Sequence, residues 1–109
     1  MITIYHNPRC SKSRAALEIA QQYAEQHQLS LQVVEYLKTP LNSAQLQTLQ
    51  TQLGAQASEL VREHSDLTEE QQRQILLEQP ELMQRPIIRF NDKAVIARPT
   101  ELIHRLLTD

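Results

Sequence analysis

The sequence is poor in residues that cross-link or interrupt a chain. Its 109 residues contain one cysteine, one glycine and no tryptophan, and aromatic residues make up 4% of the total. A single cysteine excludes an intramolecular disulfide and fits a reducing compartment, so we expect a cytoplasmic protein. The 40% apolar content, mostly aliphatic, is enough for one core. We therefore predict a single domain over residues 1–109.

Two further absences limit the partners. No apolar run approaches the roughly 18 residues that a membrane-spanning helix needs, and residues 1–6 lack the basic and long apolar regions of a signal peptide. The net charge of −2 gives no electrostatic basis for binding nucleic acid or an anionic membrane. We expect neither as a partner.

The first third of the chain has the pattern of a β-α-β unit. Residues 2–5 alternate as in a short strand, and apolar residues recur with helical spacing from Ser11 to His27. Residues 31–36 are a second strand candidate. Strands joined through a helix favour parallel pairing with a right-handed crossover.

The segment at about 42–80 is predicted to be a helical insert without strands. Leucines at helical spacing mark its first helix, and Gly54 suits the left-handed position just past the end of that helix. Residues 58–63 are expected to form a short helix. Thr68 and Gln71 have the spacing of a capping box that begins another helix, which Pro80 should stop.

The last third predicts two strands and a helix. The apolar runs 86–90 and 94–97 meet at Asn91-Asp92, which suits a two-residue hairpin turn. Pro99 is well placed in the first turn of a final helix. The complete order, β-α-β, helical insertion, β-β-α, matches an α/β thioredoxin-like fold, with a mixed central sheet flanked by helices.

Cys10 lies between the first strand and the first helix. A thiolate at this position faces the unpaired N–H groups and the positive dipole end of the helix, and Arg9, Lys12 and Arg14 add positive charge. These groups should lower the pKa of Cys10 below the ordinary value of about 8.5. A buried structural cysteine is the alternative, but a polar, cationic turn broken by proline is a poor place for a core side chain.

Ser13 completes a C-x-x-S arrangement with Cys10. A second cysteine at this position would resolve a mixed disulfide, whereas a serine cannot, so an external thiol must do so. The hydroxyl of Ser13 or of Ser11 can instead cap the helix or donate a hydrogen bond to the thiolate. His6 can tune the thiolate or serve a structural role, and the residues alone do not separate these roles.

Three arginines, Arg62, Arg85 and Arg98, lie at or near breaks in the predicted elements. Guanidinium groups bind tetrahedral oxyanions through paired hydrogen bonds, and three of them around a helix N-terminus would form an anion cradle. From spacing alone, a solvated surface charge is the simpler interpretation of each. The histidines show no mutual ligand spacing, so we expect no metal site.

The segment around Cys10 resembles the signature of the glutaredoxin-coupled arsenate reductase family. The resemblance begins with Tyr5-His6-Asn7-Pro8-Arg9-Cys10-Ser11-Lys12-Ser13-Arg14 and continues through Tyr36–Pro40, Leu53-Gly54, Glu59–Arg62, Arg85–Ile88 and Ala97–Pro99. One departure is the short segment 63–68, where many members carry a longer stretch.

This resemblance implies a function and a set of roles. Cys10 would be the nucleophile that reduces arsenate to arsenite, with arsenate or a similar oxyanion held by Arg62, Arg85 and Arg98. His6 and Ser13 would support the thiolate, and Pro86 would follow a cis bond. Glutathione would be a co-substrate, glutaredoxin a partner, and no cofactor would be tightly bound. We expect a monomer.

Two other functions remain open on the sequence. A glutathione-dependent thiol-disulfide oxidoreductase would use Cys10 but not need Arg85. An Spx-type regulator that binds RNA polymerase would share the fold, but such proteins usually carry C-x-x-C and a longer C-terminal helix. Ser13 and the stop at Asp109 are evidence against the second function.

Overall fold

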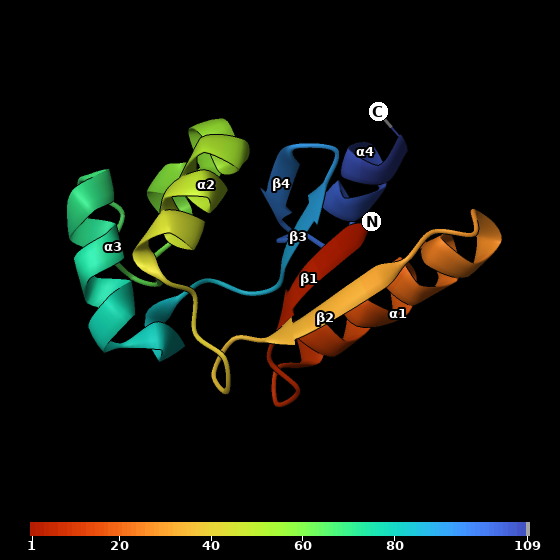
Figure 1. Ribbon diagram of the computed structural model, residues 1–109, viewed down its shortest axis with the longest axis horizontal. Coiled ribbons are helices and arrows are strands. Elements are labelled where there is room, and N and C mark those ends of the chain that lie inside the picture. The colour runs from red at the N-terminus through yellow and green to blue at the C-terminus, as the bar shows by residue number, and fades with distance from the viewer. Residues whose placement is uncertain (109) are drawn as a thin grey trace.

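A computed structural model describes residues 1–108 of the protein. Its strands, β1 (Ile2–His6), β2 (Leu31–Glu35), β3 (Ile87–Phe90) and β4 (Lys93–Ile96), form one sheet in the order β2-β1-β3-β4 (Figure 1). β1 pairs with β2 in parallel and with β3 antiparallel, and β3 pairs with β4 antiparallel. This mixed sheet follows the predicted order of strands.

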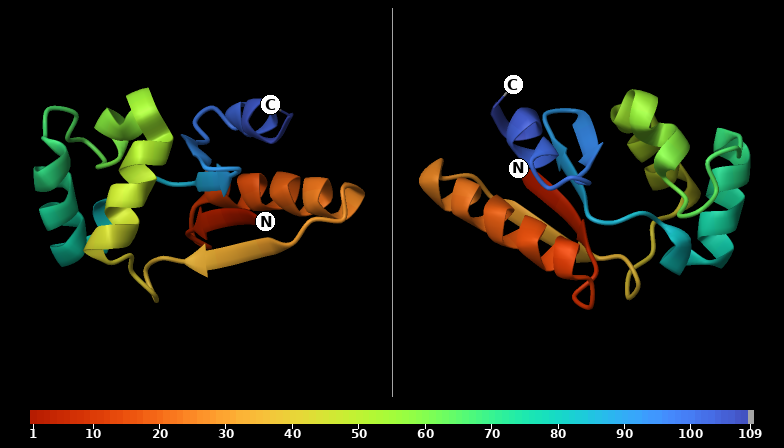
Figure 2. Two further views of the ribbon diagram at one scale, coloured as in Figure 1. Left: turned by 45° about the horizontal axis from the view of Figure 1, so that its top comes forward. Right: turned by 180° about the vertical axis from the view of Figure 1, so that it is seen from behind.

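Helices cover both faces of the sheet (Figure 2). One face packs against α1 (Ser11–Gln26) and α4 (Leu102–Thr108), and the other faces α2 (Ser43–Leu53), with α3 (Glu69–Glu78) packed outside α2. Successive side chains of β1 point to opposite faces of the sheet and so divide the core in two. Ile4 packs in the apolar cluster with α1 and α4, and Tyr5 packs in the cluster with α2 and α3. The predicted α/β thioredoxin-like fold is confirmed.

The predicted helix over residues 58–63 is wrong. A 3₁₀-helix, η1 (Gly54–Glu59), comes directly after α2, Leu60 keeps helical backbone angles, and after the single bridge residue Val61 the chain turns at Arg62 and Glu63. Val61 forms an antiparallel bridge with Met83, flanked by hydrogen bonds from the Arg62 N–H to Leu82 O (2.8 Å) and from the Gln84 N–H to Leu60 O (2.7 Å). This bridge is isolated, and residues 42–80 contain helices but no strand. The pairing crosses more than twenty residues of sequence, so local periodicity does not reveal it.

Local turn chemistry is mostly as predicted. Gly54 has a positive φ of 58° at the end of α2, but its ψ of −121° lies outside the left-handed helical region that was predicted. Thr68 and Gln71 form the predicted reciprocal capping box at α3. Asn91 and Asp92 both have positive φ in the β3–β4 turn, as a two-residue hairpin requires.

The final helix begins later than the sequence suggests. Pro99 lies in a preceding turn, where its carbonyl accepts a hydrogen bond from the Leu102 N–H (3.1 Å). α3 ends at Glu78, before Pro80, which begins the short 3₁₀-helix η2 (Pro80–Leu82). Within residues 1–108, every helix is too short or too polar to cross a membrane.

Candidate active site at Cys10

Cys10 is the N-cap residue of α1, just beyond the carboxyl end of β1. Its backbone is extended, with φ −96° and ψ 121°, and its N–H donates to Asn7 O (3.0 Å), which closes a tight loop. No side-chain oxygen of the described residues caps α1. The first-turn N–H groups are therefore available to the sulfur, which is partly exposed.

The surroundings of Cys10 favour its thiolate. Partial burial of the thiol raises its pKa, but the backbone N–H of Ser13, the Arg85 guanidinium and the backbone N–H of Lys12 together outweigh this effect. The net result is a pKa of Cys10 below the ordinary value. The direction agrees with the prediction from the helix N-terminus, and Arg85 adds a contribution from a distant part of the chain.

The side chain of Ser13 makes hydrogen bonds to the loop before Cys10 and none to the sulfur of Cys10. The side chain is completely buried, and its hydroxyl oxygen accepts the Asn7 N–H (3.0 Å) and lies 2.7 Å from Nδ1 of His6. The predicted alternatives of a hydroxyl cap on the helix or a hydroxyl bond to the thiolate are not observed. The contribution of Ser13 to the sulfur comes from its backbone N–H.

His6 is held as a neutral ring. Burial lowers its pKa, and Glu35 and the Ser13 contact oppose that effect without reversing it. A neutral imidazole accepts the Ser13 O–H at Nδ1, so the Ser13 hydroxyl and this ring nitrogen are paired with each other. His6 thus acts on Cys10 through the loop between them.

Two of the three predicted arginines reach the cysteine. Nη2 of Arg98 lies 3.9 Å from Cys10 Sγ, and its Nε donates to the backbone carbonyl of Arg85 (2.7 Å). Arg85 lies near enough to favour the thiolate. Nε and Nη1 of Arg85 are buried and have no hydrogen-bond partner among residues 1–108. Buried charged donors without partners indicate a place for an anion.

Arg62 is the third predicted arginine. The bridge between Val61 and Met83 brings its segment beside the one that carries Arg85. The charge of Arg62 acts on the hydroxyl of Tyr36. Within residues 1–108, Arg62 makes no hydrogen bond to Cys10. The structure thus places Arg85 and Arg98 at the sulfur and Arg62 at the adjacent edge of the site.

Tyr36 is a site residue that the sequence analysis missed as a functional candidate. It follows the carboxyl end of β2, and β1 and β2 are parallel, so Tyr36 and the Cys10 loop emerge at the same edge of the sheet. Its pKa is raised by burial, against the influence of Arg85 and Asn7. Tyr36 begins one of the segments that carry the family resemblance, but nothing in that segment by itself marks the hydroxyl as part of the site.

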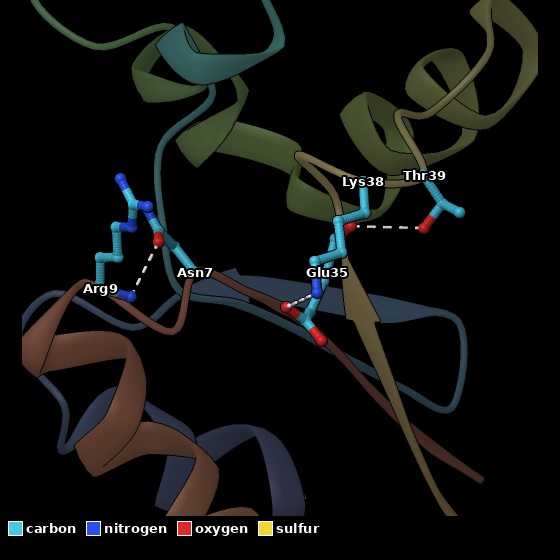
Figure 3. Close-up of polar contacts among 5 residues, drawn as sticks. All are labelled: Asn7, Arg9, Glu35, Lys38 and Thr39. Atoms are coloured by element: carbon cyan, nitrogen blue, oxygen red, sulfur yellow. Dashed lines mark hydrogen bonds and ion pairs between the residues drawn. The ribbon is translucent and has the colours of Figure 1, made fainter.

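The two loops at this edge are braced by local contacts (Figure 3). Asn7 Oδ1 accepts the Arg9 N–H (3.0 Å), and after β2 the Glu35 carboxylate pairs with Lys38 Nζ (3.5 Å) while the Glu35 carbonyl accepts the Thr39 hydroxyl (3.3 Å). These contacts fix the loop backbones around the site.

Two X–Pro bonds near the site are cis. One is Arg85-Pro86, as the resemblance implied, and the other is Arg98-Pro99, which was not expected. Among residues 1–108 no cluster of histidine, cysteine, aspartate or glutamate has the arrangement of a metal site.

Comparison with known proteins identifies the family. The ArsC family matches residues 5–106. The chain is 40% identical to the uncharacterized protein YfgD of Escherichia coli K12, over 94% of this chain and 92% of that one. It is 36% identical to an arsenate reductase of Neisseria meningitidis, over 97% of each chain. An arsenate reductase structure from Vibrio cholerae superimposes with a TM-score of 0.78 at 31% identity, over 96% of each chain. With Cys10 and its arginines inside the matched region, the chain belongs to the ArsC family.

Proposed function

We propose that this protein is an arsenate reductase that uses the Cys10 thiolate, with glutathione and glutaredoxin as external reductants. The observation that carries the proposal is the pair of buried, unpartnered donors on Arg85 beside a cysteine whose pKa is lowered. An oxyanion would satisfy those donors and present an electrophilic centre to the sulfur. Relatives named arsenate reductase, such as the Neisseria meningitidis protein, support the choice of arsenate.

The first step forms a sulfur–arsenic bond. Cys10 Sγ donates an electron pair to arsenic, and one arsenic–oxygen bond breaks. The leaving oxygen takes that bonding pair and, once protonated, departs as water. Arg85 and Arg98 offset the negative charge of the remaining oxygens, and Arg62 completes the cradle.

The later steps supply two electrons. A glutathione thiolate bonds to arsenic and displaces a second oxygen, which takes the bonding pair and leaves as water once protonated. A glutaredoxin thiolate then attacks the glutathione sulfur. The sulfur–arsenic electron pair stays on arsenic, which becomes As(III), and a glutaredoxin–glutathione mixed disulfide forms. Water displaces Cys10 from arsenic, releasing arsenite and regenerating the thiolate.

External thiols are required by the composition of the chain. Cys10 is the only cysteine of its 109 residues, so no second thiol within the chain can take over the arsenic or close an internal disulfide. The cytoplasm keeps such thiols reduced, and we assign the reaction to that compartment. All proposed site residues come from one chain, so a monomer suffices.

The test is arsenate-dependent NADPH oxidation coupled through glutathione reductase, glutathione and glutaredoxin. The wild type should turn over and release arsenite, whereas Cys10→Ser should abolish turnover, because a serine hydroxyl is not ionised at neutral pH. Ser11→Ala in the same turn, with an exposed side chain, is the matched control and should keep activity.

Absence of arsenite with the wild-type protein would disprove the proposal. Cys10-dependent deglutathionylation of a disulfide substrate in the same preparation, unaffected by Arg85→Ala, would instead identify a glutathione-dependent thiol-disulfide oxidoreductase.

A further inference from the structure

The hydroxyl of Tyr36 is buried without a hydrogen-bond partner. The residue is 1% exposed, and its ring packs among apolar side chains in and next to the insert that include Leu41, Leu46 and Met83. Its hydroxyl oxygen finds no partner among residues 1–108. A buried polar group left unpaired costs free energy, and a native protein usually retains one for a reason.

The groups near this hydroxyl are those of the candidate active site. The charges of Arg85, Arg62 and Cys10 act on it, and the side chain of Asn7 is a polar neighbour that lowers its pKa. The contact with Asn7 does not meet the geometry of a hydrogen bond, so the hydroxyl stays unpaired among residues 1–108. Burial is the largest influence and raises its pKa, so the hydroxyl keeps its proton at neutral pH and can donate it in a hydrogen bond.

Three buried donor atoms are therefore unpaired, Nε and Nη1 of Arg85 and the hydroxyl of Tyr36, and the charge of Arg85 acts on that hydroxyl. The arginine atoms can only donate, so no rearrangement among the three satisfies them all. A ligand with several acceptor oxygens does, and its negative charge would also neutralise Arg85.

We propose that the Tyr36 hydroxyl donates a hydrogen bond to an oxygen of the tetrahedral oxyanion held by Arg85, and is thereby a positioning residue of the site. This inference rests on the proposed function only for the identity of the oxyanion. The ring is anchored in the core between the insert and the sheet, so the hydroxyl holds one oxygen in a fixed direction while Cys10 meets the central atom.

The test uses Tyr36→Phe, which removes the hydroxyl and keeps the packed ring. Unfolding temperature is measured without ligand and with sodium arsenate, and the arsenate Kd is measured by calorimetry in a Cys10→Ser background, where no reaction follows. We expect an unchanged or higher unfolding temperature without ligand. The arsenate Kd should rise about tenfold or more, the effect of losing a hydrogen bond to a charged group, and KM should rise by more than kcat falls.

Tyr23→Phe is the matched control. The Tyr23 hydroxyl donates to the Leu107 carbonyl (2.8 Å), far from Cys10. Its loss should lower the unfolding temperature and leave the arsenate Kd unchanged. This is the reverse of the pattern expected for Tyr36→Phe.

Each other outcome has a defined meaning. If Tyr36→Phe lowers the unfolding temperature and leaves the arsenate Kd unchanged, the hydroxyl is structural or bound only to water, and the inference fails while arsenate reduction can stand. If the wild type binds arsenate in a Tyr36-dependent way but produces no arsenite, the proposed function fails and the inference stands. If wild type and variant both fail to bind arsenate and inorganic phosphate, the inference also fails.

Discussion

The two sides of the candidate site differ in how completely their polar groups are paired. On the loop side, the Ser13 hydroxyl accepts the Asn7 N–H and contacts His6 Nδ1, so this buried hydroxyl and this ring nitrogen are both paired within the protein. On the arginine side, two donor atoms of Arg85 and the hydroxyl of Tyr36 are buried with no partner among residues 1–108.

This difference indicates that the loop side supports Cys10 and that the arginine side binds the ligand. The paired loop side holds Cys10 in place at the helix N-terminus whether or not a ligand is present. The unpaired arginine side retains the desolvation cost of its donors until an acceptor arrives, and that cost strengthens the preference for an anion. Substitutions on the loop side should thus act on folding, and those on the arginine side on ligand binding.

The largest expected effect is on the arginine side. Arg85→Lys keeps the charge but loses the fork of donors, so kcat/KM for arsenate should fall about 10²–10³-fold, as for the loss of an oxyanion donor. Arg105→Lys, at an exposed position of α4, should change it little. Steady-state kinetics in the coupled assay measures both, and equal values for the two variants would contradict the comparison.

On the loop side, Ser13→Ala should reduce the free energy of unfolding by about 1–3 kcal/mol, because it leaves the Asn7 N–H and His6 without a buried partner. Ser11→Ala, exposed in the same turn, should change it by less than about 0.5 kcal/mol. Urea denaturation gives both values. A Ser13 variant as stable as wild type would show that the loop does not depend on this hydroxyl.

A smaller effect is expected on the pKa of Cys10, which lies between the loop side and the arginine side. The rate of Cys10 alkylation by iodoacetamide should rise with pH to a midpoint below that of a free cysteine thiol. In Arg85→Gln the midpoint should move up, because one group that favours the thiolate is gone. Arg105→Gln should leave it in place. A midpoint at or above the free-thiol value in the wild type would remove the basis for an ionised Cys10.

The smallest effect concerns His6. Its pKa is lowered in the folded protein, so between that value and about 6.5 the unfolded chain binds more protons than the folded one. The contribution of His6 to stability is therefore complete above about pH 6.5 and is lost as pH falls toward the folded pKa. His6→Gln should flatten the pH dependence of the unfolding free energy in this window, as measured by urea denaturation at a series of pH values.

Much of the fold could be predicted because its signals are local. Strand alternation, the capping box of Thr68 and Gln71 and the Asn91-Asp92 turn each act within a few residues. The helix assigned to residues 58–63 failed because Val61 pairs with Met83, and that pairing competes with helix formation only once the chain is folded.

The candidate site divides in the same way. Cys10 at a helix N-terminus follows from its immediate neighbours, and so does part of the lowering of its pKa, to which the distant Arg85 also contributes. Whether the donors of Arg85 and the hydroxyl of Tyr36 find a partner depends on which atoms surround them in the folded protein. The sequence near either residue does not indicate those surroundings. The contact of Ser13 with His6 spans seven residues, and spacing alone did not distinguish it from capping.

The sequence by itself determined the order of strands and helices, the lone cysteine at the start of a helix and the need for an external thiol. The tertiary structure decided which arginines reach the sulfur, which donors stay unpaired and where the Tyr36 hydroxyl lies. The physical reason is the range of the interactions. Capping and periodicity act between near neighbours, whereas desolvation and charge depend on every group that folding brings within a few ångströms.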